Sequence, residues 1–300
     1  MMNKKKVLIT GSNGLVGSKL LDCFQSAEQF EVIATSRSVD KNRDKSKYAF
    51  ELLDISHSPA VNYIMDLYQP EIIINTAAEA NVNYCESHRA ECREANVEGV
   101  RNLLAAAGKH RAHFVQISTD FVFQGNRELY REEDGRLPVN YYGQTKLEAE
   151  ELVETYPFHW NIIRTVLVFG KEMHYARPNF FTWIYDALKA GKNLKIVNDQ
   201  YRTPTWSEDL AKGIISLLKQ NSIGIYHIAG NEKLSIFEFA HLIARAAGFN
   251  SSLLEPVSSS SLNEPARRPV KTWLDTGKIY RETGFTPKPL KEILALLMSF

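Results

Sequence analysis

The stretch KVLITGSNGLVGSKLLDCF, residues 6–24, decides the fold of this chain. A short β-rich run, Val7 to Ile9, leads into regularly spaced glycines, and an apolar pattern at helical spacing follows them. This order predicts a strand, a tight turn and a helix. Glycines in such a turn let a pyrophosphate approach the backbone at the positive N-terminal end of the helix. We therefore expect a nucleotide-binding turn formed by Gly11, Asn13, Gly14, Leu15 and Gly17.

Strand and helix patterns alternate along the rest of the N-terminal half. Strand patterns occupy residues 31–36, 71–78, 113–118 and 161–170. Helical patterns occupy the stretches around 59–68, 86–108 and 141–155. Alternation of this kind predicts a parallel sheet with helices on both faces. The expected fold class is therefore α/β, with a doubly wound parallel sheet of Rossmann type.

The second predicted strand ends at the place where dinucleotide-binding folds read the adenosine ribose. An acidic residue there favours NAD, but this chain has Ser36 and Arg37, and the first carboxylate is Asp40. We predict NADPH as the cofactor, with Arg37 on the 2′-phosphate and Ser36 as a hydrogen-bond donor. NADH stays open as the alternative, in which Arg37 is a solvated loop arginine. Asp54 and Ile55 are expected to flank the adenine, although an ordinary strand end explains them equally well.

Tyr142 and Lys146, within YYGQTKLEAE at 141–150, are candidate catalytic residues. A four-residue offset places a phenol and an ammonium on one face of a helix. A neighbouring cation favours the charged form of a phenol and lowers its pKa toward the working range. The same spacing recurs at Tyr185 and Lys189, where a packed ring and a solvated lysine are the simpler explanation. Tyr142 differs because it follows the glycine turn and a strand that ends in Ser118, Thr119 and Asp120.

Length and composition favour a cytoplasmic enzyme. A chain of 300 residues can bury a sizeable core, with one large domain and a smaller lobe. The net charge of +1 gives no field that attracts nucleic acid or an anionic membrane. No stretch approaches the roughly 20 apolar residues of a membrane span, and the apolar run before Gly11 is too short for a signal peptide.

The cysteines, histidines and serines argue against several other classes of protein. Three cysteines without metal-ligand or redox spacing indicate reduced thiols. None of the eight histidines forms a metal-binding pair with a suitable carboxylate, so no metal is expected. No serine sits in a nucleophile-elbow context, which argues against a hydrolase.

A series of segments, taken in order, resembles the dTDP-4-dehydrorhamnose reductase family of extended short-chain dehydrogenases/reductases. The segments are ITGSNGLVGS (9–18), NTAA (75–78), STDFVFQG (118–125), REEDGRLPVNYYGQTKLEAE (131–150), NDQYRTPTWSEDLA (198–211) and ARRPVKTWLD (266–275). The ordered series runs along most of the chain and is far more specific than any single motif. It implies an oxidoreductase with a Rossmann-type domain and a small C-terminal lobe built from discontinuous segments. We assign residues 1–170 and 200–230 to the NADP-binding domain, and 171–199 and 231–300 to the substrate-binding lobe.

The resemblance also implies a mechanism. The family's catalytic Thr, Tyr and Lys correspond to Thr119, Tyr142 and Lys146, and Ala77 and Ala78 would contact the cofactor together with Tyr142 and Lys146. Reduced nicotinamide would deliver hydride to a keto carbon of a nucleotide-linked sugar while Tyr142 protonates the oxygen. Thr119 would donate a hydrogen bond to the developing oxyanion. Lys146 would lower the phenol pKa and hold the nicotinamide ribose.

Departures from the family pattern concern the sugar pocket. Reductases of this family usually show a tyrosine after Ser-Thr-Asp and a tryptophan before the second glycine turn, whereas this chain has Phe121 and Leu167. Both replacements keep apolar volume but remove a polar group or a broad stacking face, so we expect the sugar pocket to differ. An arginine guanidinium can form two parallel hydrogen bonds to phosphate oxygens. We expect three arginines and one asparagine to bind the nucleotide diphosphate: Asn179, Arg202, Arg267 and Arg268.

Two other functions stay open. Residues 130–150 and 224–249 also resemble the regulatory beta subunit of methionine adenosyltransferase, which shares this fold, binds NADP and serves as a partner protein. Under that interpretation the cofactor site is a structural relic. A nucleotide-sugar epimerase or dehydratase is the alternative within the enzymes. The residues leave open the sugar, the base and the oligomeric state, a homodimer included.

Overall fold

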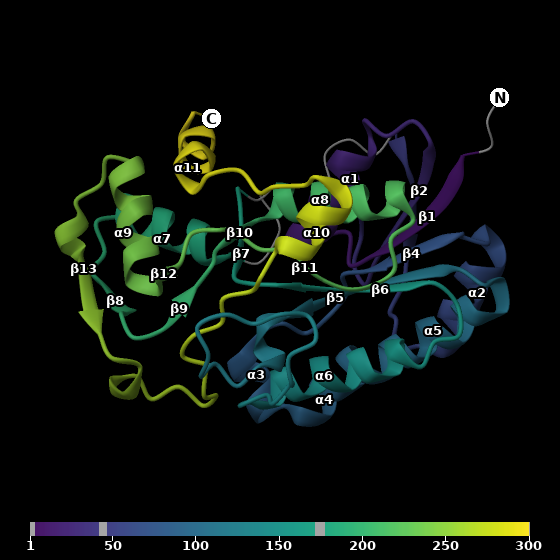
Figure 1. Ribbon diagram of the computed structural model, residues 1–300, viewed down its shortest axis with the longest axis horizontal. Helices are drawn as coiled ribbons and strands as arrows, with labels where there is room; N and C mark the ends of the chain where they lie inside the picture. The colour runs from purple at the N-terminus through teal and green to yellow at the C-terminus, as the bar shows by residue number, and fades with distance from the viewer. Residues whose placement is uncertain (1–3, 42–46, 172–177, 300) are drawn as a thin grey trace.

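The structure, a computed structural model, describes residues 4–41, 47–171 and 178–299. A seven-stranded parallel sheet forms its centre, in the order β11-β6-β5-β4-β1-β2-β3 (Figure 1). The strands are β1 (Lys5–Thr10), β2 (Phe30–Ser36), β3 (Ala49–Leu52), β4 (Ile72–Asn75), β5 (His113–Thr119), β6 (Trp160–Thr165) and β11 (Gly224–His227). Strand order reverses at β1, between β2 and β4, and open α/β sheets bind ligands at such a switch point. The predicted doubly wound parallel sheet is confirmed.

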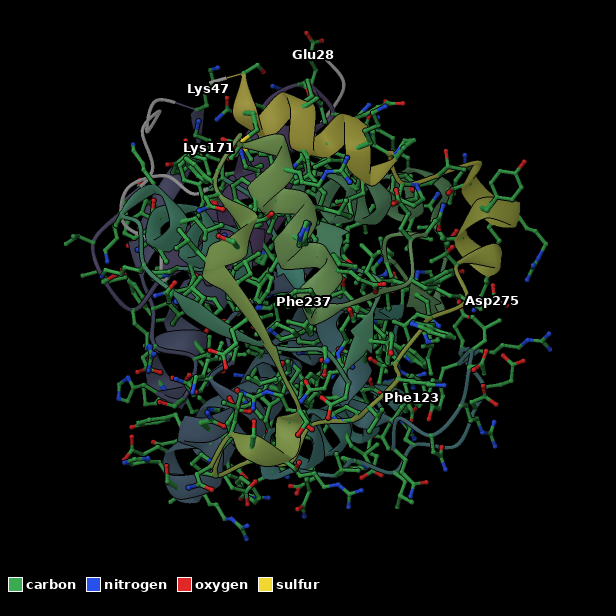
Figure 2. All side chains as sticks on the ribbon, turned by 90° about the vertical axis from the view of Figure 1, so that its left-hand side faces the viewer. Glu28, Lys47, Phe123, Lys171, Phe237 and Asp275 are labelled. Carbon is green, nitrogen blue, oxygen red and sulfur yellow. The ribbon has the colours of Figure 1, made fainter. Side chains whose placement is uncertain are left out.

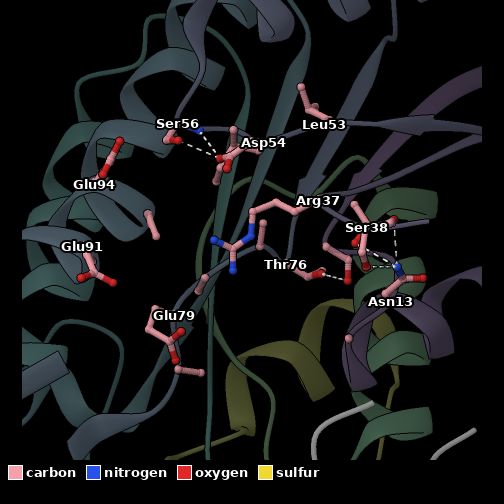
Figure 3. Close-up of a pocket in the computed structure, with 18 of the residues that line it drawn as sticks. Asn13, Arg37, Ser38, Leu53, Asp54, Ser56, Thr76, Glu79, Glu91 and Glu94 are labelled. Atoms are coloured by element: carbon pink, nitrogen blue, oxygen red, sulfur yellow. Dashed lines mark hydrogen bonds between the residues drawn. The ribbon is translucent and has the colours of Figure 1, made fainter. Parts of the chain in front are cut away.

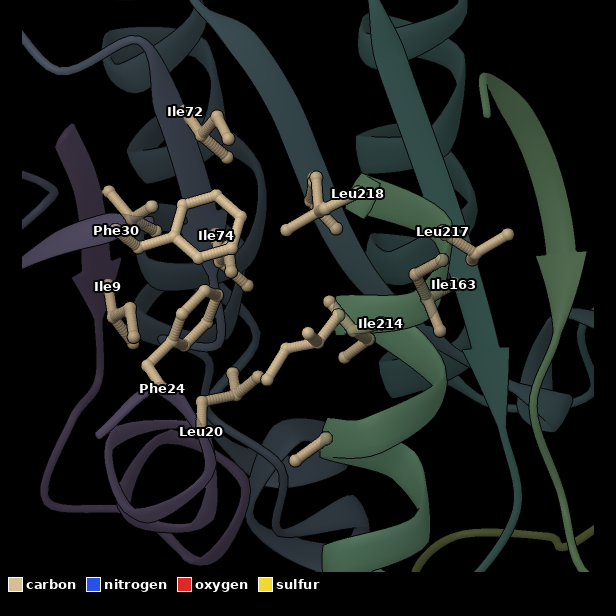
Figure 4. Packing of buried hydrophobic residues seen from close by; sticks show 14 of the residues in the cluster. Ile9, Leu20, Phe24, Phe30, Ile72, Ile74, Ile163, Ile214, Leu217 and Leu218 are labelled. Atoms are coloured by element: carbon tan, nitrogen blue, oxygen red, sulfur yellow. The ribbon is translucent and has the colours of Figure 1, made fainter. Parts of the chain in front are cut away.

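Helices cover both faces of the sheet. One face carries α1 (Leu15–Phe24), α8 (Ser207–Gln220) and α10 (Gly277–Thr283), and the other carries α2 (Ser58–Tyr68), α5 (Gly99–His110) and α6 (Tyr141–Glu154). Side chains alternate across a strand, so Ile72 and Ile74 of β4 pack on one face of the sheet (Figure 4) and Ile73 packs on the opposite face. Burial on both faces explains why these strands read as continuous apolar runs. In the described ranges, no helix has both the length and the apolar character needed to cross a membrane.

The helix predicted over 86–108 is interrupted in the structure. It is divided into α3 (Val82–Ser87), α4 (Arg89–Arg93), a π-helical turn η2 (Glu94–Glu98) and α5. The wide turn carries the buried Asn96, whose amide bonds both to the backbone of Glu79 and to Thr145 Oγ1 of α6. Side-chain bonds to distant partners compete with regular helical geometry, and π-turns of this kind are frequent at functional sites.

A second apolar core lies beyond β6, at the left of Figure 1. Phe169, Phe181, Phe239 and Ile293 form its centre. Figure 2 views the molecule from this side, with Phe237 labelled. Its elements are α7 (Phe180–Lys189), α9 (Ile236–Ala246), α11 (Leu290–Met298), the pairs β7 (Val168–Phe169) with β10 (Thr205–Trp206), β8 (Leu194–Val197) with β13 (Leu254–Val257) and β9 (Tyr201–Arg202) with β12 (Leu234–Ser235), and the 3₁₀ turns η4 (Ser251–Leu253) and η5 (Ser259–Ser261).

We propose a division of the chain that shifts the predicted boundaries. Trp206 of β10 packs in the second core, although residues 200–230 were predicted to belong with the sheet. Ile279 of α10 packs under the sheet, although 231–300 was predicted to belong to the lobe. Helix α10 therefore returns to the sheet between two segments of the lobe. Residues 172–177 of the predicted lobe lie outside the described residues.

Candidate functional site

A pocket of about 660 Å³ opens beside the glycine turn (Figure 3). It is lined by predicted cofactor residues that follow β1, β2, β3 and β4: Gly11, Asn13, Gly14, Leu15, Ser36, Arg37, Asp54, Ile55, Ala77 and Ala78. These residues meet because parallel strands place their carboxyl ends at one edge of the sheet. The structure therefore brings together the predicted nucleotide-binding residues from widely separated segments.

One wall of this pocket comes from a helical segment that the sequence did not predict to line it. Glu91, Glu94 and Ala95 of α4 and the π-turn contribute to it. The pocket is also lined by six residues that were not predicted: Ser38, Leu53, Ser56, Thr76, Glu79 and Ala80. Several of these neighbour predicted residues and could have been included by adjacency. The α4 wall carries no motif, because its position depends on how that helix packs.

The glycine turn has the geometry of an anion site. Gly11 adopts φ +68, and Gly14 N–H donates to its carbonyl at 2.9 Å. Helix α1 begins after Gly14 without a side-chain cap, so its first amides are left for water or a ligand. Gly17 does not line the pocket. A Cβ atom there would lie 2.4 Å from the Gly11 carbonyl oxygen, so Gly17 is needed for the close approach of α1 to the turn.

The Asn13 side chain organises the loop that presents Arg37. Its Nδ2 donates to Ser36 Oγ at 3.0 Å and to Val39 O at 2.9 Å, and its Oδ1 accepts from Lys41 N at 3.0 Å. The Arg37 guanidinium extends into the pocket in Figure 3. Ser36 Oγ accepts a hydrogen bond from Asn13, so its hydroxyl proton can still be donated to a ligand. This arrangement suits the predicted donor role of Ser36.

The three predicted catalytic residues lie together at the end of β5, outside the lining of this pocket. Thr119 is the last residue of β5, and the Tyr142 ring of α6 contacts Phe121, two residues after it. The Asn140 side chain caps α6 by accepting from Gly143 N at 2.8 Å. A Cβ atom on Gly143 would lie 2.3 Å from the Phe121 carbonyl oxygen. Glycine at this position therefore lets α6 approach the 3₁₀ turn η3 (Asp120–Val122) closely enough for the contact.

Burial is the main cause of the pKa shifts of both Tyr142 and Lys146. Burial raises the pKa of Tyr142, the hydrogen bond with Thr119 opposes this rise, and the Asp120 charge adds to it. Lys146 Nζ donates to the backbone oxygen of Ile117 at 2.7 Å. Burial lowers the pKa of Lys146 to about 8, and the charge of Glu150 opposes that fall. Thr119 thus acts to lower the phenol pKa, and the lowering predicted for Lys146, whose ammonium donates to the strand, stays a prediction.

Thr119 has more partners than its predicted role assumed. Its Oγ1 donates to Asp120 Oδ1 at 3.1 Å and accepts from Phe121 N at 3.2 Å. The predicted bond from Thr119 to an oxyanion needs the proton that Asp120 receives here. The Phe121 ring meets Tyr142 edge-on, with ring centroids 5.7 Å apart. Phe121, predicted to shape the sugar pocket, thus lies against the proposed acid.

Leu167 stands at the junction between β6 of the sheet and β7 of the lobe. Its φ of +36 is rare for a branched side chain and carries backbone strain. The side chain is half-buried and packs against apolar clusters on both sides of the junction. The predicted substrate residue is therefore held in an unusual conformation where the two lobes meet.

The predicted diphosphate ligands fall into two groups. The Asn179 side chain caps α7 and donates to Gly170 O at 2.8 Å. The Arg202 guanidinium is buried and donates to backbone carbonyls of Tyr201, Val270 and Pro269. The polar atoms of both side chains thus bond within the protein, and their contact with a diphosphate stays a prediction.

The other two arginines stand on one short segment. Arg267 is exposed, and its carbonyl accepts from Asn140 Nδ2 at 2.7 Å. Arg268 is partly buried and pairs with Glu264. Since Asn140 caps α6, this segment is tied to the helix that carries Tyr142. Both arginines remain predicted ligands.

Known proteins resemble this chain along nearly its whole length. A dTDP-4-dehydrorhamnose reductase ortholog from Clostridium acetobutylicum has a TM-score of 0.87 and 31% identity, covering 98% of each chain. A dTDP-4-dehydrorhamnose reductase from Bacillus anthracis in complex with NADP has a TM-score of 0.84 and 29% identity, covering 99% of each. Methionine adenosyltransferase 2 subunit beta from Bos taurus is 31% identical over 92% of this chain and 81% of that protein. The family model described as RmlD substrate binding domain matches residues 5–299, and the chain belongs to that family.

Proposed function

We propose that this protein is an NADPH-dependent reductase of a nucleotide-linked 4-keto sugar, with dTDP-4-dehydrorhamnose as the first substrate to test. The observation that carries the proposal is the packing of α6 against the carboxyl end of β5, where Thr119 lies: Tyr142 and Lys146 stand one turn apart on α6, and Lys146 Nζ donates to Ile117 O of the strand at 2.7 Å. A half-buried phenol whose pKa is raised stays protonated near neutrality, which is the form that an acid catalyst of ketone reduction needs.

Reduced nicotinamide supplies the hydride when it is bound. Tyr142 then donates its proton to the carbonyl oxygen of the sugar. Lys146, one turn further along α6, would hold the nicotinamide ribose. Thr119, at the end of β5, would orient the sugar oxygen beside the Tyr142 hydroxyl.

Cofactor choice rests on the loop after β2. Arg37 enters the pocket without a carboxylate beside it in the chain, which suits the 2′-phosphate of NADPH. The reductase from Bacillus anthracis was solved in complex with NADP, which supports the same choice. The three cysteines are free thiols, and on this ground we propose a cytoplasmic location.

The direct test is turnover. Purified protein with NADPH and dTDP-4-dehydrorhamnose should lose the absorbance of the reduced cofactor in proportion to sugar reduced. Matching UDP- and GDP-linked 4-keto sugars form the comparison set. Melting curves with dTDP, UDP and GDP rank the bases independently, since a ligand at 100 times its Kd stabilises by about 2.7 kcal/mol.

The likeness to methionine adenosyltransferase 2 subunit beta supplies the competing outcome. A non-catalytic binding subunit would bind NADPH without consuming it in the presence of any keto sugar. A nucleotide-sugar epimerase or dehydratase would convert its substrate with no net loss of reduced cofactor. Either result overturns the proposed reductase.

A further inference from the structure

The β3 loop, residues 53–56 directly after β3, lines the pocket beside the glycine turn. Asp54 closes a turn within this loop. Its Oδ1 accepts from Ser56 N at 3.0 Å and from Ser56 Oγ at 2.8 Å (Figure 3). A carboxylate has two oxygens that accept hydrogen bonds. The turn therefore occupies one oxygen of Asp54, and the other can accept from a ligand in the pocket.

The Asn102 side chain of α5 holds the far end of this loop. Its Nδ2 donates to Ile55 O at 3.0 Å and to Ser56 O at 2.9 Å. A side-chain amide has two protons to donate, and here they go to two consecutive carbonyls. The partners are 47 and 46 positions apart in the chain. A helix from a distant segment thus fixes the backbone of the loop.

Gly99, about one turn before Asn102 on the same face of α5, lets the helix come close enough for these bonds. A Cβ atom on Gly99 would lie 2.6 Å from Ile55 Cγ1. The Ile55 side chain is buried and belongs to the same apolar cluster as Val100 and Leu103 of α5. Apolar packing therefore holds the loop against the helix, and the Asn102 amide sets the direction of its carbonyls.

The β3 loop is also bonded to the strand end that is expected to read the adenosine ribose. Leu53 N donates to Ser36 O at 2.9 Å. Ser36 and Arg37, the predicted partners of the ribose and its 2′-phosphate, line the same pocket. The adenine is attached to that ribose, so the neighbouring β3 loop is the part of the pocket that suits the base.

We propose that Asn102 is a positioning residue for the adenosine half of the cofactor, which holds the β3 loop so that the Asp54 carboxylate accepts from the adenine amino group. This inference rests on the proposed function, since it needs the pocket to bind NADPH. Asn102 stands behind the pocket lining and acts through the loop. A loop that is already held needs no further ordering when the ligand binds, and this raises affinity.

The experiment measures the Kd of NADPH and of adenosine 2′,5′-bisphosphate, its adenosine half, by titration calorimetry of the full chain. Asn102→Ala should weaken both ligands by the same factor, about tenfold or more for two lost hydrogen bonds. Asn102→Asp keeps the shape of the side chain but cannot donate, so it should show the same loss. Asn62 of α2 also donates to a backbone carbonyl, Ser58 O at 2.9 Å, and Asn62→Ala should change neither Kd.

Asp54→Asn, at an exposed position, covers the case in which the Asn102 variants fail to fold. Its amide oxygen can still accept from Ser56, but its other group is now a donor facing the adenine amine, so both ligands should bind more weakly. In this background Asn102→Ala should add little, because the two residues serve one contact.

Parent-like affinity in Asn102→Asp or in Asp54→Asn, or losses that simply add in the double variant, overturns the inference. These outcomes leave the proposed function standing, since the parent still binds NADPH. A parent protein that binds neither ligand contradicts the proposed function, and the role of Asn102 fails with it.

Discussion

Lys146 Nζ lies 2.7 Å from the backbone oxygen of Ile117, so the buried ammonium bonds to strand β5 and not to the phenol one turn before it. Burial lowers the pKa of Lys146 to about 8, and the charge of Glu150, one turn further along α6, opposes the fall. The lysine therefore carries its charge at neutral pH and loses it in mildly alkaline solution.

The pH profile of sugar reduction should report this titration. Turnover should fall as pH rises through about 8, because Lys146 becomes neutral there. Glu150→Gln removes the carboxylate that raises the lysine pKa, so the fall should begin at lower pH. Glu148→Gln on the same helix is the control and should leave the profile in place. A profile that is the same in all three proteins would contradict a role for the Lys146 charge.

Substitution of the tyrosine in each tyrosine–lysine pair should affect turnover differently. Tyr142→Phe removes the proposed proton donor and should reduce turnover by about 10²–10⁴-fold, while NADPH affinity changes little. The Tyr185 ring packs against Phe181 and Phe249 in the lobe core, so Tyr185→Phe should keep turnover. Steady-state kinetics of both variants, with NADPH titration by fluorescence, provide the measurement. An active Tyr142→Phe beside an inactive Tyr185→Phe would reverse the assignment.

Cofactor preference should depend on Arg37. The parent protein should bind NADPH more tightly than NADH, and Arg37→Asp should invert the order, because a carboxylate repels the 2′-phosphate and accepts from the ribose hydroxyls. Fluorescence titration of both cofactors measures this. Arg245→Asp, at an exposed position of α9, controls for the change in net charge. Equal affinity of the parent for the two cofactors would contradict the assignment.

Stability should depend strongly on one buried ion pair. Arg164 of β6 and Glu150 are almost fully buried, with Arg164 Nη2 at 2.8 Å from Glu150 Oε2. Arg164→Met leaves the Glu150 charge without its buried partner and should cost about 3–5 kcal/mol of unfolding free energy. Arg136 also pairs with Glu150 but is partly exposed, so Arg136→Met should cost about 1 kcal/mol or less. Denaturant unfolding of the three proteins gives the values, and similar losses in both variants would contradict the ranking.

Local patterns in the chain predicted much of the site. The glycine turn, the ends of β2, β3 and β4, and the Tyr142–Lys146 spacing each depend on neighbours within a few residues. The parallel sheet then gathers them at one edge, as the alternation of strand and helix requires. The electrostatic role of Lys146 stays a prediction, since helical spacing gives the face of a side chain but not the group that its end reaches.

By itself, the sequence determined the sheet and the glycine turn, because spacing along a strand or helix fixes which face a residue occupies. The Tyr142–Lys146 pair was predicted from the same spacing, and Thr119 was added by the family resemblance. The tertiary structure alone decided the partners of the buried polar groups. Asp120 and Thr272 are 152 positions apart, and Arg202 bonds to Pro269. The π-turn places Asn96 against Glu79 and Thr145 in the same way. Such pairings follow from the need of every buried polar atom for a partner, and only the folded chain shows which distant segment supplies it.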